Sequence, residues 1–257
     1  MTRLIIFIYL LSAFLTAQPT GRAIMEKLDQ IKKPIDIQTQ LKMTLISMKG
    51  KKERRRSREL TSIEKKYEDG KFKSKSLLRF SKPKEVKGTG FLTWDKVGSN
   101  PDDQWLYLPA LKKVKRIRTK EKGRSFMGTD FSYEDLSGRN LDADEYELLG
   151  EESIHGSSCY KVEAKPKEKG GQYSSRIVWV EKHNSLMKRV VFFNKKGDRF
   201  KILDIPDHVK NGDYWTATKM IMKNLKNNHR TELDVLKVDY DQELKDNVFT
   251  ESFLKRL

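Results

Sequence analysis

The chain has 257 residues, 35% of them charged, and its 53 Lys and Arg outnumber its 36 Asp and Glu to give a net charge of +17. This positive balance indicates an anionic partner. The only cysteine, Cys159, excludes an internal disulfide, so the fold must depend on its hydrophobic core.

The first seventeen residues have the pattern of a secretory signal peptide. Arg3 supplies a positive charge, residues 4–15 form an apolar run too short to span a bilayer comfortably, and Ala17 offers a cleavage site. We therefore expect cleavage near Ala17 and a soluble periplasmic protein of residues 18–257. An uncleaved N-terminal anchor is the alternative. In the periplasm the positive charge matches the phosphate head groups of an anionic membrane surface better than nucleic acid.

One helix and then many strands are predicted along residues 18–257. No break in composition divides this stretch, which we expect to form a single domain. Thr20 can cap a helix from Gly21 to about Lys33, and Pro34 ends it. From Ile35 apolar residues alternate with polar ones, which is the period of a half-buried strand.

Further strands follow at regular spacing, separated by turn signals such as the five-residue hairpin loop 194–198. Residues 214–222 are expected to form one of these strands, and Thr250 can cap a short terminal helix. In total we expect ten or eleven antiparallel strands, a pattern that favours a barrel or a strongly curved sheet.

The segment 88–136 is rich in large aromatic side chains but has no nucleophile–base pair, metal-ligand spacing or phosphate-binding glycine loop. Aromatic surface without reactive groups indicates a site that holds an apolar ligand and does no chemistry on it. The simpler alternative is that these side chains are core. The candidates for lining an apolar cavity are Trp94, Trp105, Tyr107, Phe126, Met127 and Phe131.

A very basic run extends from Lys49 to Arg58. Within it, Arg54, Arg55 and Arg56 are candidates for contact with an anionic head group or partner, because guanidinium groups match the geometry of phosphate oxygens. A solvated hairpin whose positive charge protects an edge strand is an equally good interpretation. A second basic run, residues 112–124, is a candidate for a loop over the cavity mouth.

Catalytic and metal sites have little support. The four histidines stand apart without the spacing of a zinc site, and no cofactor or metal is expected. Asp130, Glu134 and Asp135 are the carboxylates considered for catalysis, as in sugar hydrolysis, with a turn or salt-bridge role as the favoured alternative.

Three stretches carry a resemblance to a known family: residues 103–111 (DQWLYLPAL), 115–117 (KRI) and 125–136 (SFMGTDFSYEDL). Together they resemble the outer-membrane lipoprotein-sorting protein family of the LolA-like superfamily. The resemblance implies a mainly β protein with a few helices, an antiparallel unclosed β half-barrel with helices across its concave face. In better-known members of the superfamily the enclosed apolar cavity takes acyl chains, and members of this family are thought to work with inner-membrane exporters.

Three functions follow from these observations. The first is a non-catalytic periplasmic carrier or chaperone that binds the acyl chains of a lipid or lipoprotein for transfer between the inner and outer membrane, alone or with an inner-membrane exporter. The second is a periplasmic sensor of similar fold that relays lipid or envelope state to a membrane protein. The third is a hydrolase that uses Asp130 and Asp135.

Overall fold

A computed structural model describes residues 18–50, 52–98, 101–168 and 170–256. The expected signal peptide, residues 1–17, lies outside these ranges. Within them the chain forms fifteen strands, two α-helices and five short 3-10 helices. No helix in this part of the chain has the length and apolar character to cross a membrane.

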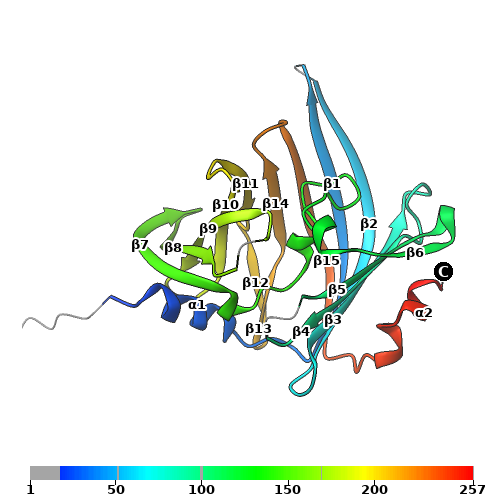
Figure 1. Ribbon diagram of the computed structural model, residues 1–257, viewed down its shortest axis with the longest axis horizontal. Coiled ribbons are helices and arrows are strands. Elements are labelled where there is room, and N and C mark those ends of the chain that lie inside the picture. The colour runs from blue at the N-terminus through cyan, green and yellow to red at the C-terminus, as the bar shows by residue number, and fades with distance from the viewer. Residues whose placement is uncertain (1–17, 51, 99–100, 169, 257) are drawn as a thin grey trace, which may run out of the picture.

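Thirteen of the described strands form one antiparallel sheet, and β12 and β13 form a separate hairpin (Figure 1). The strands are β1 Asp36–Lys49, β2 Lys52–Lys66, β3 Phe72–Lys82, β4 Gly90–Lys96, β5 Asp103–Leu108, β6 Lys113–Arg116, β7 Asp144–Ile154, β8 Ser157–Pro166, β9 Tyr173–Glu181, β10 Met187–Asn194, β11 Arg199–Asp204, β12 His208–Asn211, β13 Tyr214–Ala217, β14 Lys219–Asn224 and β15 His229–Tyr240.

The sheet consists of two meanders joined through the last strand. Its order is β6-β5-β4-β3-β2-β1-β15-β14-β11-β10-β9-β8-β7, so β15 pairs with β1 on one side and β14 on the other. The ends of the order, β6 and β7, are not hydrogen-bonded to each other, and the sheet is therefore open. The expected antiparallel unclosed half-barrel is confirmed.

Helix α1 (Gly21–Asp29) packs on the concave face of the sheet against β7, β8 and β9. The Thr20 side chain accepts a hydrogen bond from the amide of Ala23, as expected of its N-cap. Ile24 is 2% exposed and belongs to the main core. A Cβ atom on Gly21 would lie 2.9 Å from the backbone of Glu147, so only glycine allows the helix to approach β7 this closely.

The convex face carries a second core beneath the end of the chain. Phe249 and Leu254 are fully buried there against Leu92 and Trp105, with Leu254 in α2 (Glu251–Leu254). Gly90 allows this approach, because a Cβ atom there would lie 2.6 Å from Leu254 Cδ1. The two helices therefore cover opposite faces of the sheet, as Figure 1 shows for α1 and α2.

The stretch expected to be one strand, residues 214–222, is two strands in different sheets. β13 pairs with β12, whereas β14 pairs with β11 and β15. Thr218 separates them because its amide donates to Asp207 and its carbonyl accepts from Val235. The inward-facing side chains change from Trp215 and Ala217 before the break to Met220 and Met222 after it, so the alternation shifts by one residue at Thr218. The expected terminal helix cap at Thr250 is confirmed, since its hydroxyl accepts from the amide of Phe253.

We expect Phe249→Ala to lower the free energy of unfolding by about 3–5 kcal/mol, because it empties a fully buried aromatic site between the C-terminal segment and the convex face. Urea denaturation measures this loss. Phe253→Ala, which truncates a half-buried neighbour, is the control and should cost less. A smaller loss for Phe249→Ala than for Phe253→Ala would show that the C-terminal segment is not anchored in this way.

Candidate functional site

An apolar cavity of about 540 Å³ lies between α1 and the concave face of the sheet. We call it the α1 groove. Met25 and Leu28 of the helix form one wall, and inward-facing residues of β9, β10, β11 and β14 form the other. His208 and Trp215 of the β12–β13 hairpin also line it. The apolar sheet residues of the groove are Val178, Met187, Val190, Phe192, Leu203 and Met222.

The other half of the concave face is filled by the chain itself. Phe126 is fully buried, and its ring packs on those of Phe80, Phe91 and Tyr133 at centroid distances of 5.1–6.1 Å. The tight loop that carries it is held by hydrogen bonds of its own, including the one from the Thr129 hydroxyl to the carbonyl of Phe126. This loop therefore occupies the inside of the half-barrel next to β3 and β4 and leaves the region under α1 open.

Three of the six candidates from the sequence lie on the concave face of the sheet and three on the convex face. Phe131 lines the α1 groove. Phe126 is in the main core, and Met127 packs against that core. Trp94, Trp105 and Tyr107 face the convex side with the C-terminal segment and do not line the groove.

Strand alternation explains this division. Leu92 pairs with Trp105, and Phe91 pairs with Leu106. Neighbouring residues of a strand point to opposite faces, so Leu106 enters the concave core while Trp105 points away from it. The Nε1–H of Trp94 donates to the carbonyl of Phe249 at 2.9 Å, which fixes that indole under the chain end.

Most of the groove comes from residues that the sequence analysis did not select. Val178 and Val190 alternate with Ile177 and Val191, which are apolar too and face a third, convex cluster around buried Cys159. Because both faces of β9 and β10 are apolar, the sequence pattern alone does not say which face is covered by a helix. The sequence signal that could have pointed to the groove is that β9 and β10 have apolar residues on both faces.

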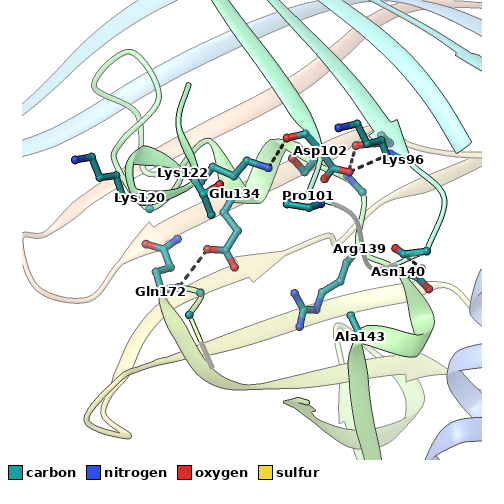
Figure 2. A pocket seen from close by; sticks show the side chains of 18 of the residues that line it. Lys96, Pro101, Asp102, Lys120, Lys122, Glu134, Arg139, Asn140, Ala143 and Gln172 are labelled. Carbon is teal, nitrogen blue, oxygen red and sulfur yellow. Dashed lines mark hydrogen bonds between the residues drawn. The ribbon is translucent and has the colours of Figure 1, made fainter. Parts of the chain in front are cut away.

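A second cavity, of about 520 Å³, adjoins the groove and is lined by many charged side chains. We call it the polar pocket (Figure 2). Seven cationic side chains and three carboxylates line it among the described residues. The cationic side chains are Lys73, Lys96, Lys120, Lys122, Arg139, Arg176 and Lys195, and the carboxylates are Asp95, Asp102 and Glu134.

Burial shifts the pKa values of several of these charged side chains. Burial, and after it the nearby Asp102 carboxylate, raise the pKa of Asp95 to about 6, against the opposing effect of a hydrogen bond from Ser74. Burial lowers the pKa of Lys122, whose ammonium donates to the carbonyl of Asp102 at 2.9 Å. Four residues line both the polar pocket and the α1 groove, namely Glu134, Ser137, Arg139 and Arg176.

Asp130 and Asp135, the carboxylates of the hydrolase hypothesis, have buried side chains that are engaged within the protein, and Glu134 forms an ion pair with Arg176. Asp135 accepts hydrogen bonds from the hydroxyl of Tyr173 (2.7 Å), the ammonium of Lys201 (3.0 Å) and both the amide and hydroxyl of Ser132 (2.7 and 2.8 Å). These contacts tie the loop after residue 131 to β9 and β11. They are the contacts of a structural ion pair.

Asp130 has a similar environment. Its Oδ2 accepts from the hydroxyl of Thr231 at 2.7 Å and lies 2.6 Å from Nδ1 of His229, and its amide donates to Thr231 Oγ1 at 3.0 Å. The loop is thus tied to β15 as well. Among the described residues no group of three or more His, Cys, Asp or Glu side chains is placed to hold a metal ion.

Residues 52–57 of the basic run are exposed at the end of the β1–β2 hairpin, which projects beyond its neighbours at the top of Figure 1. The register pairs Leu45 with Arg56 and Ile46 with Arg55, so Arg54 and Arg56 share the concave side while Arg55 points the other way. Arg55 also forms an ion pair with Glu53 at 2.6 Å. The three candidates therefore do not form one cluster.

Comparisons with known proteins agree with this architecture. A family model described as that of an uncharacterized protein matches residues 73–256. The crystal structure of an outer membrane lipoprotein-sorting protein domain from Vibrio parahaemolyticus is 31% identical with a TM-score of 0.85, over 92% of this chain and 98% of that one. A DUF1329 family protein from Desulfovibrio piger is 33% identical with a TM-score of 0.85, over 91% of this chain and 97% of that one.

A more distant structure shares the fold. The LolA superfamily protein NE2245 from Nitrosomonas europaea is 19% identical with a TM-score of 0.70, over 92% of this chain and 100% of that one. Comparison with curated proteins gave no match.

We expect Asp135→Asn to lower the free energy of unfolding by about 3–5 kcal/mol, because it leaves the buried Lys201 ammonium without its anionic partner. Adding Lys201→Met to that variant should recover part of the loss, since no unpaired charge then remains. Urea denaturation of the two single variants and the double variant measures the coupling. Equal and additive losses would show that the pair is not a buried structural unit.

Proposed function

This chain belongs to the family of the outer membrane lipoprotein-sorting and DUF1329 proteins, with a LolA-like fold, and from this we propose that it is a non-catalytic carrier of acyl chains in the periplasm. Its cargo is a lipid or a lipoprotein, moved between the inner and outer membrane. An inner-membrane exporter is the partner from which it would receive that cargo.

The observation that carries the proposal is the α1 groove. Its volume of about 540 Å³ is within the range of roughly 300–1,000 Å³ for ligand cavities. Transfer of each methylene from water into an apolar site is worth about 0.8 kcal/mol, so a chain of some fifteen methylenes needs a comparable apolar surface to leave a bilayer. Val178, Val190 and Phe192 supply such a surface, and Met25, Met187 and Met222 add side chains that adapt to varied chains.

The β1–β2 hairpin is proposed to contact the anionic membrane surface. Arg54 and Arg56 are exposed and lie on the same side of the hairpin as the concave face. Each basic residue near an anionic surface contributes about 1 kcal/mol. Docking through this hairpin would bring the open side of the half-barrel toward the lipid that it takes up.

We expect a fluorescent fatty-acid probe to bind with micromolar affinity, roughly 8 kcal/mol, and Leu28→Glu to weaken this binding about tenfold or more. The substitution places a carboxylate in the α1 groove on a half-buried helix position. Leu236→Glu is the matched control, because Leu236 is 57% exposed on β15 and does not line the groove.

Thermal melts of both variants separate loss of binding from loss of folding. Unchanged probe affinity in a folded Leu28→Glu protein would refute the assignment of the groove as the acyl site.

We expect binding to vesicles with anionic lipid to weaken as salt is raised, because exposed charges are screened beyond about 8 Å at physiological ionic strength. Reversal of Arg54 and Arg56 to Glu should weaken it by roughly 2 kcal/mol or more. Arg55→Glu should have a smaller effect, since Arg55 faces the other side and is paired with Glu53. Co-sedimentation with the vesicles measures binding by the wild type, the double variant and Arg55→Glu. Equal binding by the double variant and the wild type would leave the hairpin as solvated surface.

A further inference from the structure

Two arginines stand where the α1 groove meets the polar pocket. Arg139 and Arg176 line both cavities, together with Glu134 and Ser137. An occupant of the groove can therefore place its polar end against these guanidinium groups without leaving the cavity.

Arg176 is buried but incompletely satisfied. The residue is 9% exposed, and its Nη2 donates to Glu134 Oε1 at 3.1 Å. Its Nη1 is buried and has no hydrogen-bond partner within the described part of the chain. The guanidinium lies over the ring of Tyr173, at 5.0 Å, which holds it in place on β9. A buried donor without an acceptor costs free energy, and an anion placed there removes that cost.

Arg139 adds a second positive charge at the same place. Burial alone would lower the pKa of Arg139, but its hydrogen bonds to Asp144 outweigh this and raise it, so the group remains charged. Burial lowers the pKa of Arg176, and repulsion from Arg139 lowers it further. Figure 2 shows the Arg139 guanidinium and the Glu134 carboxylate directed into the same space, with Lys120 and Lys122 on the facing side of the pocket. Within the described ranges, Glu134 is the carboxylate that forms an ion pair with Arg176, at 3.1 Å.

The lining of the cavity changes from charged to apolar side chains over a short distance along β9. Arg176 pairs with Phe192 across to β10 and with Ala164 across to β8, and all three line a wall of the groove or its polar end. Val178 points to the same face two residues further along β9, about 7 Å away. The structure therefore places an anion-binding group next to an apolar channel, the arrangement needed for the head and tail of one amphiphile.

We propose that Arg176 and Arg139 bind the phosphate group of a lipid whose acyl chain occupies the α1 groove. This proposal rests on the proposed function, because it assigns the chemistry of the cargo at the same site. Guanidinium groups bind phosphate oxygens through paired, charge-assisted hydrogen bonds. The phosphate accepts from Nη1 of Arg176, while Glu134 holds the other side of that guanidinium when no cargo is bound.

The test compares two lipids with the same acyl chain, monopalmitoyl lysophosphatidic acid and monopalmitoylglycerol, by displacement of the fatty-acid probe, with inorganic phosphate as a third competitor. The wild type should bind the phosphate-bearing lipid roughly tenfold more tightly than the glyceride. Arg176→Gln should abolish this preference and keep the affinity for the glyceride. Arg199→Gln, the same substitution at an exposed arginine that lines neither cavity, is the charge-matched control and should keep the preference.

A second variant works in the opposite direction. Glu134→Gln removes the carboxylate that competes for Arg176, so it should tighten binding of the phosphate-bearing lipid several-fold and leave the glyceride unchanged. A gain of affinity cannot come from a failure to fold. Thermal melts of Glu134→Gln and Arg176→Gln, compared with that of the wild type, show whether both variants are folded.

Equal affinity of the wild type for the two lipids, or a preference that survives Arg176→Gln, would overturn the headgroup site and leave the carrier function standing. Binding of inorganic phosphate in an Arg176-dependent manner, with neither lipid bound, would make the site one for free phosphate and reject both the headgroup site and the acyl carrier. Failure of all three competitors to bind would overturn both as well.

Discussion

The concave face of one open sheet has to be covered, and the rest of the structure depends on how this is done. Thirteen antiparallel strands present apolar side chains on the inside of a half-barrel whose end strands, β6 and β7, do not pair with each other. Near β3 and β4 the chain covers this face with its own loop, in which Phe126 is fully buried. Near β9 and β10 the short helix α1, the β12–β13 hairpin and the edge of that loop cover the face, and a cavity remains.

The buried charges are arranged around this division. The Asp135–Lys201 pair and the Asp130 contacts anchor the loop to β11 and β15, so they stabilise the filled half of the barrel. At the border of the open half, Arg176 has a partner for one nitrogen and none for the other within the described residues. A buried guanidinium nitrogen that belongs to a cavity-lining residue and has no hydrogen-bond partner among the described residues is consistent with a ligand at that border.

Local signals in the sequence were sufficient for much of the fold. The Thr20 and Thr250 caps, the change of period at Ile35 and the open antiparallel sheet were all predicted, the last from the family resemblance. The break at Thr218 was not predicted, although the apolar positions shift there from Trp215 and Ala217 to Met220 and Met222. The hydrogen bonds that make the break join Thr218 to Asp207 and Val235. The number of strands was underestimated because short strands such as β6 and β12 are defined by hydrogen bonds to their partner strands more than by their own sequence pattern.

The site was harder to predict than the fold. Aromatic content identified Trp94, Trp105 and Tyr107, but which face of a strand meets a helix is decided by the whole sheet, and here the C-terminal segment covers that face. The groove residues Val178 and Val190 have the apolar side chains of ordinary buried strands. They line the groove because the elements above them leave a cavity. Likewise, Arg54, Arg55 and Arg56 are adjacent in the sequence, but the strand separates them onto two faces.

The most direct test of the account is to locate a bound acyl chain by NMR. A fatty acid with a nitroxide label near the end of its chain broadens methyl signals close to it. The account predicts broadening of the methyl signals of Val178, Val190 and Leu203 in the α1 groove, with those of Leu77 and Leu92 on the convex face unaffected. Broadening at Leu77 and Leu92 instead, or at none of these methyl groups, would contradict it.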